Sequence, residues 1–295
     1  MKANWSVFFI VLVLGMSSCF KNSEDPNAQL NADMKLIDEY LAATFVTDAL
    51  YDNSSGLRFV IDTYGNDAPP HEGQTVKVEY IGKILTSSGL SNVSFDSGEI
   101  NDNLEDVVPE GLKYALSLML KGSSGTVYIP SKWGYGETGT TSVPANSILV
   151  YNVFVEDVIR TTTQINQMKA DTAAIHTWIK ANKPEAIMHS SGFWYTIDQP
   201  GTGSYPTPYS VVAFDYTLKL LTNTGPGTAI QQNSSPNTGI FSLIDGLKLG
   251  FPRAQVGSTL TFYFPSILGY GATAQTSIPA NSNLAFEIKL TSIAQ

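Results

Sequence analysis

Gly134-Tyr135-Gly136, followed by Val-Pro-Ala-Asn-Ser at residues 143–147, is the stretch that decides the fold, because the chain contains it twice. The second copy is Gly269-Tyr270-Gly271, followed by Ile-Pro-Ala-Asn-Ser at residues 278–282. Both motifs return at an offset of 135 positions. A fixed offset shared by ordered motifs indicates that one structural unit is repeated.

The repeat extends outward from these motifs toward the start of each copy. Ser-Gly-Leu-Arg-Phe-Val-Ile-Asp at residues 55–62 returns as Ser-Gly-Phe-Trp-Tyr-Thr-Ile-Asp at residues 191–198. Tyr80 returns as Tyr216, and here the offset is 136. The chain therefore consists of two tandem modules of similar fold.

The pattern of apolar residues predicts that each module is an α+β unit with an antiparallel sheet. Residues 75–81 alternate, with Val76, Val78 and Tyr80 on one face, which is typical of a half-buried strand. Residues 109–120 place Leu112 and Leu116 on one helical face, and a glycine follows. The other predicted strands cover residues 125–130, 148–155, 213–221, 259–264 and 284–291, and the other short helix lies near residues 244–251.

A longer helical stretch precedes the strand-rich part of each module, so the chain divides into five segments. We expect a signal peptide over residues 1–18, a tether and helix over 19–54, the first module over 55–160, a linking helix over 161–190 and the second module over 191–295. The stretch at residues 222–239 is rich in Gly, Asn, Thr and Pro, and we expect a flexible loop there.

The first 19 residues have the pattern of an export signal. Lys2 precedes an apolar run at residues 5–14, which is too short to cross a bilayer well. Met16-Ser17-Ser18-Cys19 follows, and Cys19 is the only cysteine of the chain. This ending resembles a bacterial lipobox, in which cleavage leaves a lipid-modified cysteine at the new N-terminus. An ordinary signal peptide with an incidental cysteine is the alternative.

Composition excludes several classes of function. The formal net charge of −9 opposes binding to nucleic acid, because phosphate backbones repel an acidic protein. One cysteine and three scattered histidines show no spacing typical of a metal site. We therefore expect neither nucleic-acid partner, nor metal, nor cofactor.

The ordered motifs of the first module resemble the FKBP-type peptidyl-prolyl isomerases. The matching residues are Val-Glu-Tyr-Ile-Gly at 78–82, Phe-Asp-Ser at 95–97, Lys-Gly at 121–122, Gly-Tyr-Gly at 134–136 and residues 143–151. The resemblance covers residues 55–158 and, more loosely, 191–293. It implies a five- or six-stranded antiparallel sheet wrapped around a short helix, with a pocket between the two.

The resemblance also implies which residues form the pocket. In the first module it gives catalytic roles to Tyr80, Asp96 and Tyr135, and places walls at Phe95, Val107, Val108, Leu112, Val143 and Tyr151. In the second module the matching positions are Tyr216, Leu243, Ile244, Leu247, Tyr270, Ile278 and Phe286.

Three departures from the family pattern concern this pocket. The family usually has a tryptophan on the short helix, where Leu112 and Leu247 stand here. Glu110 looks like a one-residue insertion, which leaves the register of the preceding proline open. The second module lacks the Phe-Asp pair, and Ile230-Gln231 is its nearest candidate. These departures predict weaker ligand binding and a degenerate second module.

Two functions follow, and the sequence leaves both open. The first is a peptidyl-prolyl cis-trans isomerase of the bacterial cell envelope, anchored by lipid and acting mainly through the first module. The second is a non-catalytic chaperone or peptide-binding lipoprotein of the same fold. In both, the partners are proline-containing unfolded or exported polypeptides, and the expected location is the outer membrane, on its periplasmic or surface face.

Overall fold

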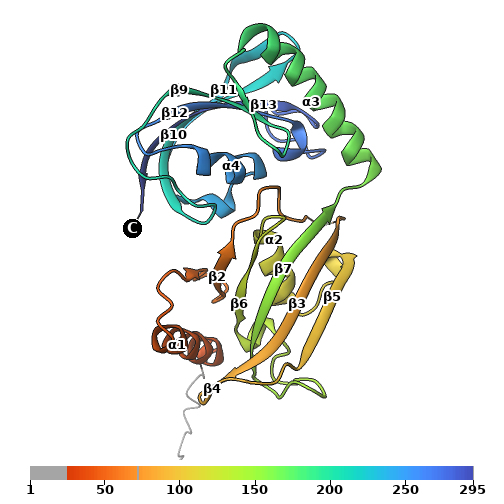
Figure 1. The fold of residues 1–295 in the computed structure, drawn as a ribbon, viewed down its shortest axis with the longest axis vertical. Helices are drawn as coiled ribbons and strands as arrows, with labels where there is room; N and C mark the ends of the chain where they lie inside the picture. The colour runs from red at the N-terminus through yellow and green to blue at the C-terminus, as the bar shows by residue number, and fades with distance from the viewer. Residues whose placement is uncertain (1–24, 72, 295) are drawn as a thin grey trace, which may run out of the picture.

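The computed structural model describes residues 25–71 and 73–294 and places them in two modules, each preceded by an α-helix (Figure 1). The predicted signal segment and Cys19 lie outside the described residues. Within residues 25–71 and 73–294, no helix is both long and apolar enough to cross a membrane. The predicted α+β class, with two antiparallel sheets, is confirmed.

In module 1, an antiparallel sheet of long and short strands wraps around one short helix. Its sheet has the order β1-β2-β6-β7-β3-β4, and β5 also pairs with β3, on the edge opposite to β7. Counting the two-residue strands, this makes seven strands, one more than expected. The elements are α1 (Ala28–Ala43), β1 (Leu50–Tyr51), β2 (Arg58–Thr63), β3 (Thr75–Thr86), β4 (Gly89–Leu90), β5 (Asp96–Asn103), η1 (Leu104–Asp106), α2 (Glu110–Leu118), β6 (Ser124–Ile129), η2 (Ser131–Trp133) and β7 (Ile148–Ile159).

Module 2 repeats this plan with six strands in the order β11-β10-β13-β12-β9-β8. Its elements are α3 (Thr162–Asn182), β8 (Ile187–Met188), β9 (Trp194–Gln199), β10 (Val211–Thr222), β11 (Gly225–Gly239), η3 (Ile240–Ser242), α4 (Asp245–Gly250), η4 (Phe251–Arg253), β12 (Thr259–Phe264), η5 (Ser266–Leu268) and β13 (Asn283–Ile293).

The expectation of a flexible loop at residues 222–239 is wrong, because most of this stretch is strand β11. It pairs antiparallel with β10 from Thr222↔Gly225 to Val211↔Gly239, with three register irregularities. Gly225 has a φ of 108°, so the tight turn into the strand favours glycine there. β11 is an edge strand with mostly exposed residues, so prolines are tolerated and no apolar alternation is needed.

A buried carboxylate docks the preceding helix onto each module. Asp33 of α1 accepts hydrogen bonds from the backbone N–H of Ser131 at 2.7 Å and from its hydroxyl at 2.5 Å. Asp171 of α3 does the same with Ser266, at 3.0 and 2.5 Å. Both aspartates are buried, and each accepts hydrogen bonds from two polar groups of a serine that is itself buried.

The helix of each module packs its apolar face into the sheet. In α2 the predicted face is confirmed, because Leu112, Ala115 and Leu116 are buried and join the core cluster with Tyr151. All six residues of α4 are buried, although the sequence shows no reason for covering both faces of that helix. Module 1 covers the face of α4 that the sheet of module 2 does not.

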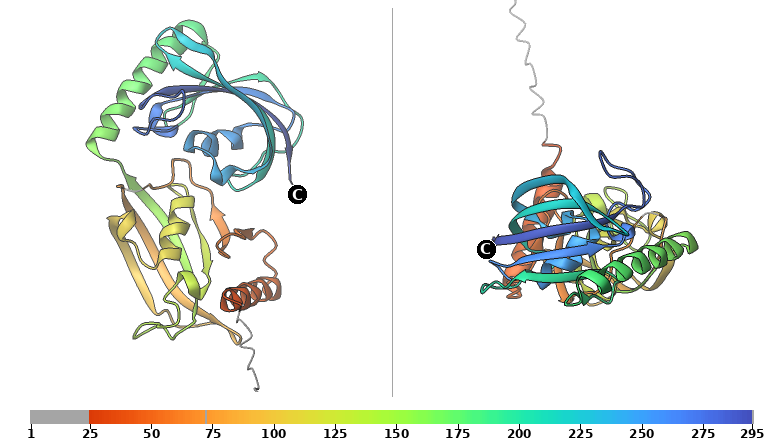
Figure 2. Two further views of the ribbon diagram at one scale, coloured as in Figure 1. Left: turned by 180° about the vertical axis from the view of Figure 1, so that it is seen from behind. Right: turned by 90° about the horizontal axis from the view of Figure 1, so that it is seen from above.

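The two modules touch along a loop that leaves β2. Figure 2 shows α1 at the end of module 1 that is remote from module 2, while the β2–β3 loop faces α4. Ala68 of this loop, and Leu120 after α2, belong to the same hydrophobic cluster as the core of module 2. Within module 1, Arg160, which directly follows β7, holds this loop through an ion pair with Asp67 at 3.0 Å. The modules are therefore joined by packing as well as by the chain.

Candidate functional site

Three aromatic side chains form the inner wall of the candidate site in module 1. Tyr80 on β3, Phe95 just before β5 and Tyr151 on β7 come together because β3 pairs with both other strands. The ring of Tyr151 lies 6.0 Å from that of Tyr80 and 5.7 Å from that of Phe95, between centroids. Gly82 permits this approach, since a Cβ there would lie 2.7 Å from the Phe95 ring.

Asp96 lies at the rim of this wall and is bonded to Tyr80. The Tyr80 hydroxyl donates to Oδ2 of Asp96 at 2.9 Å. Burial, together with this hydrogen bond, raises the pKa of Tyr80 to about 12. The phenol therefore keeps its proton at neutral pH and remains a donor to the carboxylate.

Tyr135 brings a third hydroxyl to the site. It lies half-buried in the loop after η2, which is held by hydrogen bonds from Gly136 N–H to Ser131 O at 2.9 Å and from Asn146 N–H to Gly136 O at 2.7 Å. Burial, and then the neighbouring Tyr135 hydroxyl, raises the pKa of Tyr151 above its ordinary value. The site thus gathers three phenol hydroxyls and one carboxylate beside apolar side chains.

Of the other residues predicted to line the pocket, three are buried and one is exposed. Val107, Leu112 and Val143 are buried in the same cluster as Tyr151, against which Tyr80, Phe95 and Tyr135 pack. Val108 is 68% exposed and is not part of that cluster. The structure therefore turns Val108 outward, and Val107 takes the inward position.

The sequence offset between corresponding elements of the two modules changes near Val108, and this change explains why Val108 points outward. Leu104 and Ile240 begin matching turns, η1 and η3, at an offset of 136, whereas Glu110 and Asp245 begin matching helices at an offset of 135. The extra residue of module 1 therefore lies between η1 and α2. Module 1 thus has one extra residue relative to module 2, as the interpretation of an insertion supposed, but Glu110 is the first residue of its helix and the extra residue precedes it.

The same alignment places Pro109 opposite Ile244, since each residue is the N-cap of its helix. Proline has no N–H, so module 1 offers no backbone donor at this point of the wall. In module 2 the N–H of Ile244 exists, and it has no acceptor among the described residues. The two pockets therefore differ in hydrogen-bonding capacity at the helix entrance.

Module 2 has an open cleft of about 290 Å³ at the matching place. Six of the predicted residues line it, namely Tyr216, Leu243, Ile244, Leu247, Tyr270 and Phe286, together with Phe214, Gln231, Ser235 and Ser242. Ile278 is buried in the cluster behind the cleft. Sequence reasoning missed Phe214, although it lies two positions before Tyr216 on β10 and so faces the same way.

Strand register shows what replaces the Phe-Asp pair in module 2. Asp96 pairs with Gly82 on β3, and Gln231 pairs with Leu218, which is 136 positions after Gly82. Gln231 therefore occupies the place of Asp96, and Ile230 that of Phe95. Module 2 keeps an apolar cleft but lacks the carboxylate that holds the tyrosine in module 1.

Comparison with known proteins agrees with this geometry. The family model described as FKBP-type peptidyl-prolyl cis-trans isomerase matches residues 66–156 and 203–291, together more than half of the chain. The FkpA isomerase of Aeromonas hydrophila is 38% identical over 117 residues, which cover 39% of this chain and 43% of that protein. The FkpA of Escherichia coli K12 is 32% identical over 107 residues, which cover 36% of this chain and 39% of that protein.

The crystal structure of FkpA from Escherichia coli matches with a TM-score of 0.36 and 25% identity, over 44% of this chain and 64% of that one. The alignments with both FkpA proteins span less than half of each relative's length. The family model, by contrast, matches once in each module and includes the tyrosine, the short helix and the Gly-Tyr-Gly loop of both. The chain therefore belongs to the FKBP-type peptidyl-prolyl cis-trans isomerase family and carries two domains of that family in tandem.

Proposed function

We propose that module 1 catalyses cis–trans isomerisation of prolyl peptide bonds. The observation that carries the proposal is the Tyr80–Asp96 hydrogen bond at the rim of an apolar wall made by Phe95, Tyr135 and Tyr151. The reaction makes and breaks no covalent bond, so it requires neither nucleophile nor metal. It requires a site that favours a twisted amide over both planar forms.

An apolar wall lowers the barrier by removing water from the prolyl carbonyl. The planar amide carries negative charge on its oxygen, which water stabilises, whereas the twisted amide carries less. A pocket that buries the proline ring and excludes water therefore costs the planar forms more. The Tyr135 hydroxyl supplies a single oriented donor, which fixes the position of the carbonyl without restoring its hydration.

Two features weaken substrate binding in module 1. Leu112 gives less contact area and no flat ring surface where the family usually has tryptophan. Pro109 provides no N–H at the N-cap of α2. We expect a higher KM than in family members that have both groups, and a less affected turnover once substrate is bound.

We propose that module 2 binds proline-containing or apolar segments without efficient turnover. Its cleft is open and retains the donor N–H of Ile244, but Gln231 replaces the carboxylate opposite the tyrosine. This second candidate function, peptide holding, agrees with a site in which Tyr216 has lost its oriented partner. Client proteins are expected to be unfolded polypeptides that expose X–Pro bonds.

The division of labour is tested by matched substitutions in the full chain. Exchange of a proline peptide between cis and trans is measured by NMR for Asp96→Ala and for Gln231→Ala, which change corresponding positions. We expect Asp96→Ala to lower kcat/KM about tenfold and Gln231→Ala to leave it within twofold. Equal losses, or a loss only in the second variant, would show that module 1 does not carry the activity.

We also propose that the chain is exported and lipid-anchored in a bacterial cell envelope through Cys19. The support is the apolar run at residues 5–14 followed by Met-Ser-Ser-Cys at 16–19. Two or more acyl chains would anchor it stably, because each buried methylene contributes about 0.8 kcal/mol. Detergent-phase partitioning of wild type and Cys19→Ser tests this, and recovery of both in the aqueous phase would contradict it.

A further inference from the structure

The first turn of α4 in module 2 carries an acidic and a basic residue that are buried, unlike the same pair in module 1. In α2, Glu110 and Lys113 form an ion pair at 2.8 Å, with side chains 68% and 28% exposed. In α4, Asp245 and Lys248 form the matching pair at 3.0 Å, with side chains 6% and 10% exposed. The difference arises because module 1 covers α4.

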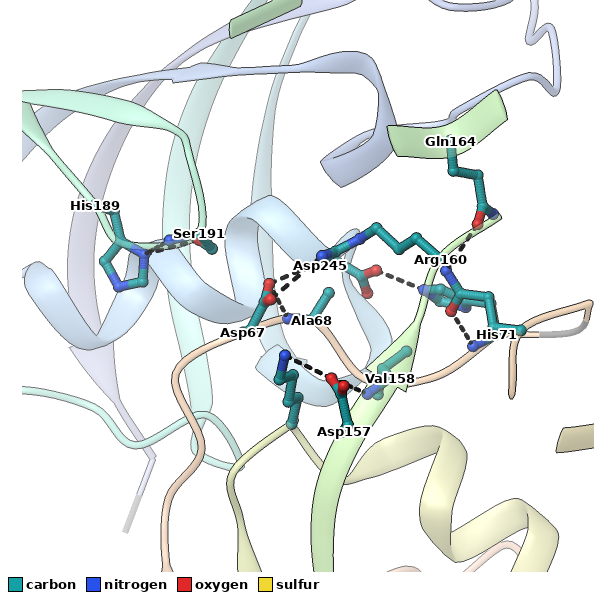
Figure 3. A network of polar contacts seen from close by, with 12 residues as sticks. Asp67, Ala68, His71, Asp157, Val158, Arg160, Gln164, His189, Ser191 and Asp245 are labelled. Carbon is teal, nitrogen blue, oxygen red and sulfur yellow. Dashed lines mark hydrogen bonds and ion pairs between the residues drawn. The ribbon is translucent and has the colours of Figure 1, made fainter. Parts of the chain in front are cut away.

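His71 of module 1 completes this buried pair. Its Nε2 lies 2.5 Å from Oδ2 of Asp245 (Figure 3). The Lys248 ammonium donates to Oδ1 of the same carboxylate at 3.0 Å. The loop that carries His71 is itself fixed, since the His71 N–H donates to Oε1 of Gln74 at 2.9 Å and Gln74 N–H donates to His71 O at 3.1 Å. Each oxygen of the Asp245 carboxylate thus has one partner, and the two partners come from different modules.

The ionised state of Asp245 depends on both partners. Burial alone would raise the pKa of Asp245, but the hydrogen bond from His71 and the charge of Lys248 hold it below its ordinary value. A buried carboxylate that loses one fixed partner is costly unless solvent reaches it, and the His71 side chain that covers Asp245 is 53% exposed. Without His71, the first turn of α4 must therefore shift or open to solvent.

A shift of this turn would move the wall of the module 2 cleft. Ile244 precedes Asp245 directly, and Leu247 follows two positions later in the same turn. Hydrogen bonds from Leu247 N–H and Lys248 N–H to Ile244 O, at 2.9 and 3.1 Å, tie both wall residues to the acidic pair. Ile244 and Leu247 line the cleft.

We propose that His71 of module 1 is a positioning residue for the peptide-binding cleft of module 2. The affinity of module 2 for an apolar, proline-containing segment then depends on contact with module 1. This inference rests on the proposed binding role of module 2 and adds that the two domains of the chain are functionally coupled through one hydrogen bond at their interface.

The test uses the full chain with methyl-labelled Ile, Leu and Val, titrated with a succinyl-Ala-Leu-Pro-Phe amide. Signals of Leu247 and Ile278 report binding to module 2, and signals of Leu112 and Val143 report binding to module 1. We expect His71→Ala to raise the Kd of module 2 about fivefold or more and to leave that of module 1 within twofold. Glu110→Gln, which alters the corresponding acidic residue of module 1, whose side chain is 68% exposed, serves as control and changes neither Kd.

A conservative substitution distinguishes a positioning role of His71 from general damage to the fold. The amide nitrogen of glutamine replaces imidazole Nε2, so His71→Gln restores the module 2 Kd to within twofold of wild type, whereas His71→Ala does not. Equal module 2 affinities in wild type and His71→Ala, or a Gln variant as weak as the Ala variant, overturn the inference. Wild-type signals of module 2 that do not respond to peptide also overturn it, whereas failure of the proposed catalysis appears separately, as absence of prolyl exchange.

Discussion

The hydroxyl of Tyr80 and the carboxylate of Asp96 are joined across two paired strands by a hydrogen bond of 2.9 Å. Strand register holds them together, because Asp96 pairs with Gly82, two positions after Tyr80 on β3. Module 2 has a tyrosine and a glutamine at the same places. This pair is therefore the clearest chemical difference between the two domains.

The two members of this pair are expected to act as one unit. Tyr80→Phe and Asp96→Ala should each lower kcat/KM for a proline peptide about tenfold, because each removes the bond that orients the wall. The double variant should lose little more than either single variant, since the same interaction is already gone. Losses that multiply in the double variant would show that the residues act separately. NMR exchange spectroscopy measures all three.

Tyr135 is expected to contribute more to turnover than to stability. Tyr135→Phe removes one hydroxyl from a half-buried ring and leaves the packing of that ring intact. We expect kcat to fall about three- to tenfold, with a change in the free energy of unfolding of no more than about 1 kcal/mol. Parallel measurements of prolyl exchange and urea unfolding check this, and an unchanged kcat would remove Tyr135 from the site.

We predict that proton uptake by His189 makes the folded protein less stable in mild acid. Burial, and then the charge of Arg253, lowers the pKa of His189 from 6.5 to about 4. The unfolded chain therefore takes up this proton first as pH falls, so the stability present above pH 6.5 declines until pH reaches about 4. After allowance for solvent screening, the loss is about 1–2 kcal/mol.

Urea unfolding at pH 7.5 and pH 4.5 measures this effect. His189→Gln cannot titrate, so the difference in unfolding free energy between the two pH values should shrink by the same amount in that variant. Carboxylates that also titrate in this range contribute equally to both proteins and cancel in the comparison. A variant with the same pH dependence as wild type would contradict the prediction.

The docking aspartates predict losses of stability that differ between the two modules. Asp33→Ala leaves the N–H and hydroxyl of Ser131 buried without a partner. Asp171→Ala removes the partner of the Ser266 hydroxyl, whereas the Ser266 N–H keeps Oδ1 of Asn283 at 3.0 Å. Asp33→Ala should lower the free energy of unfolding by about 2–3 kcal/mol, and Asp171→Ala by about 1–2 kcal/mol. Glu39→Ala, which breaks only the exposed pair with Lys35, should change it by less than about 0.5 kcal/mol. Chemical denaturation compares the three.

The sequence allowed the repeated fold to be predicted because the signals involved are local and periodic. Alternation over residues 75–81 and the apolar face of residues 109–120 correspond to β3 and α2. Strand β11 escaped prediction because an edge strand exposed on both sides needs no alternation. Its Gly and Pro content is also typical of loops.

The parts of the site that depend on register or on distant contacts could not be predicted. The outward turn of Val108 follows from one extra residue between η1 and α2, and the sequence alone does not say which residue of the segment is the extra one. His71 lies 174 positions from Asp245, and no spacing rule connects residues so far apart. Only the folded chain shows that a loop of one domain reaches the helix of the other.

Ala68 and Leu120 lie in the interior of a domain to which they do not belong by sequence. The first half of this duplicated protein therefore contributes apolar residues to the core of the second half. Replacing one module by that of a relative would expose apolar side chains at the interface between the modules. Substitutions at the interface in one module are therefore constrained by the other module, while the residues of the two pockets are free to differ.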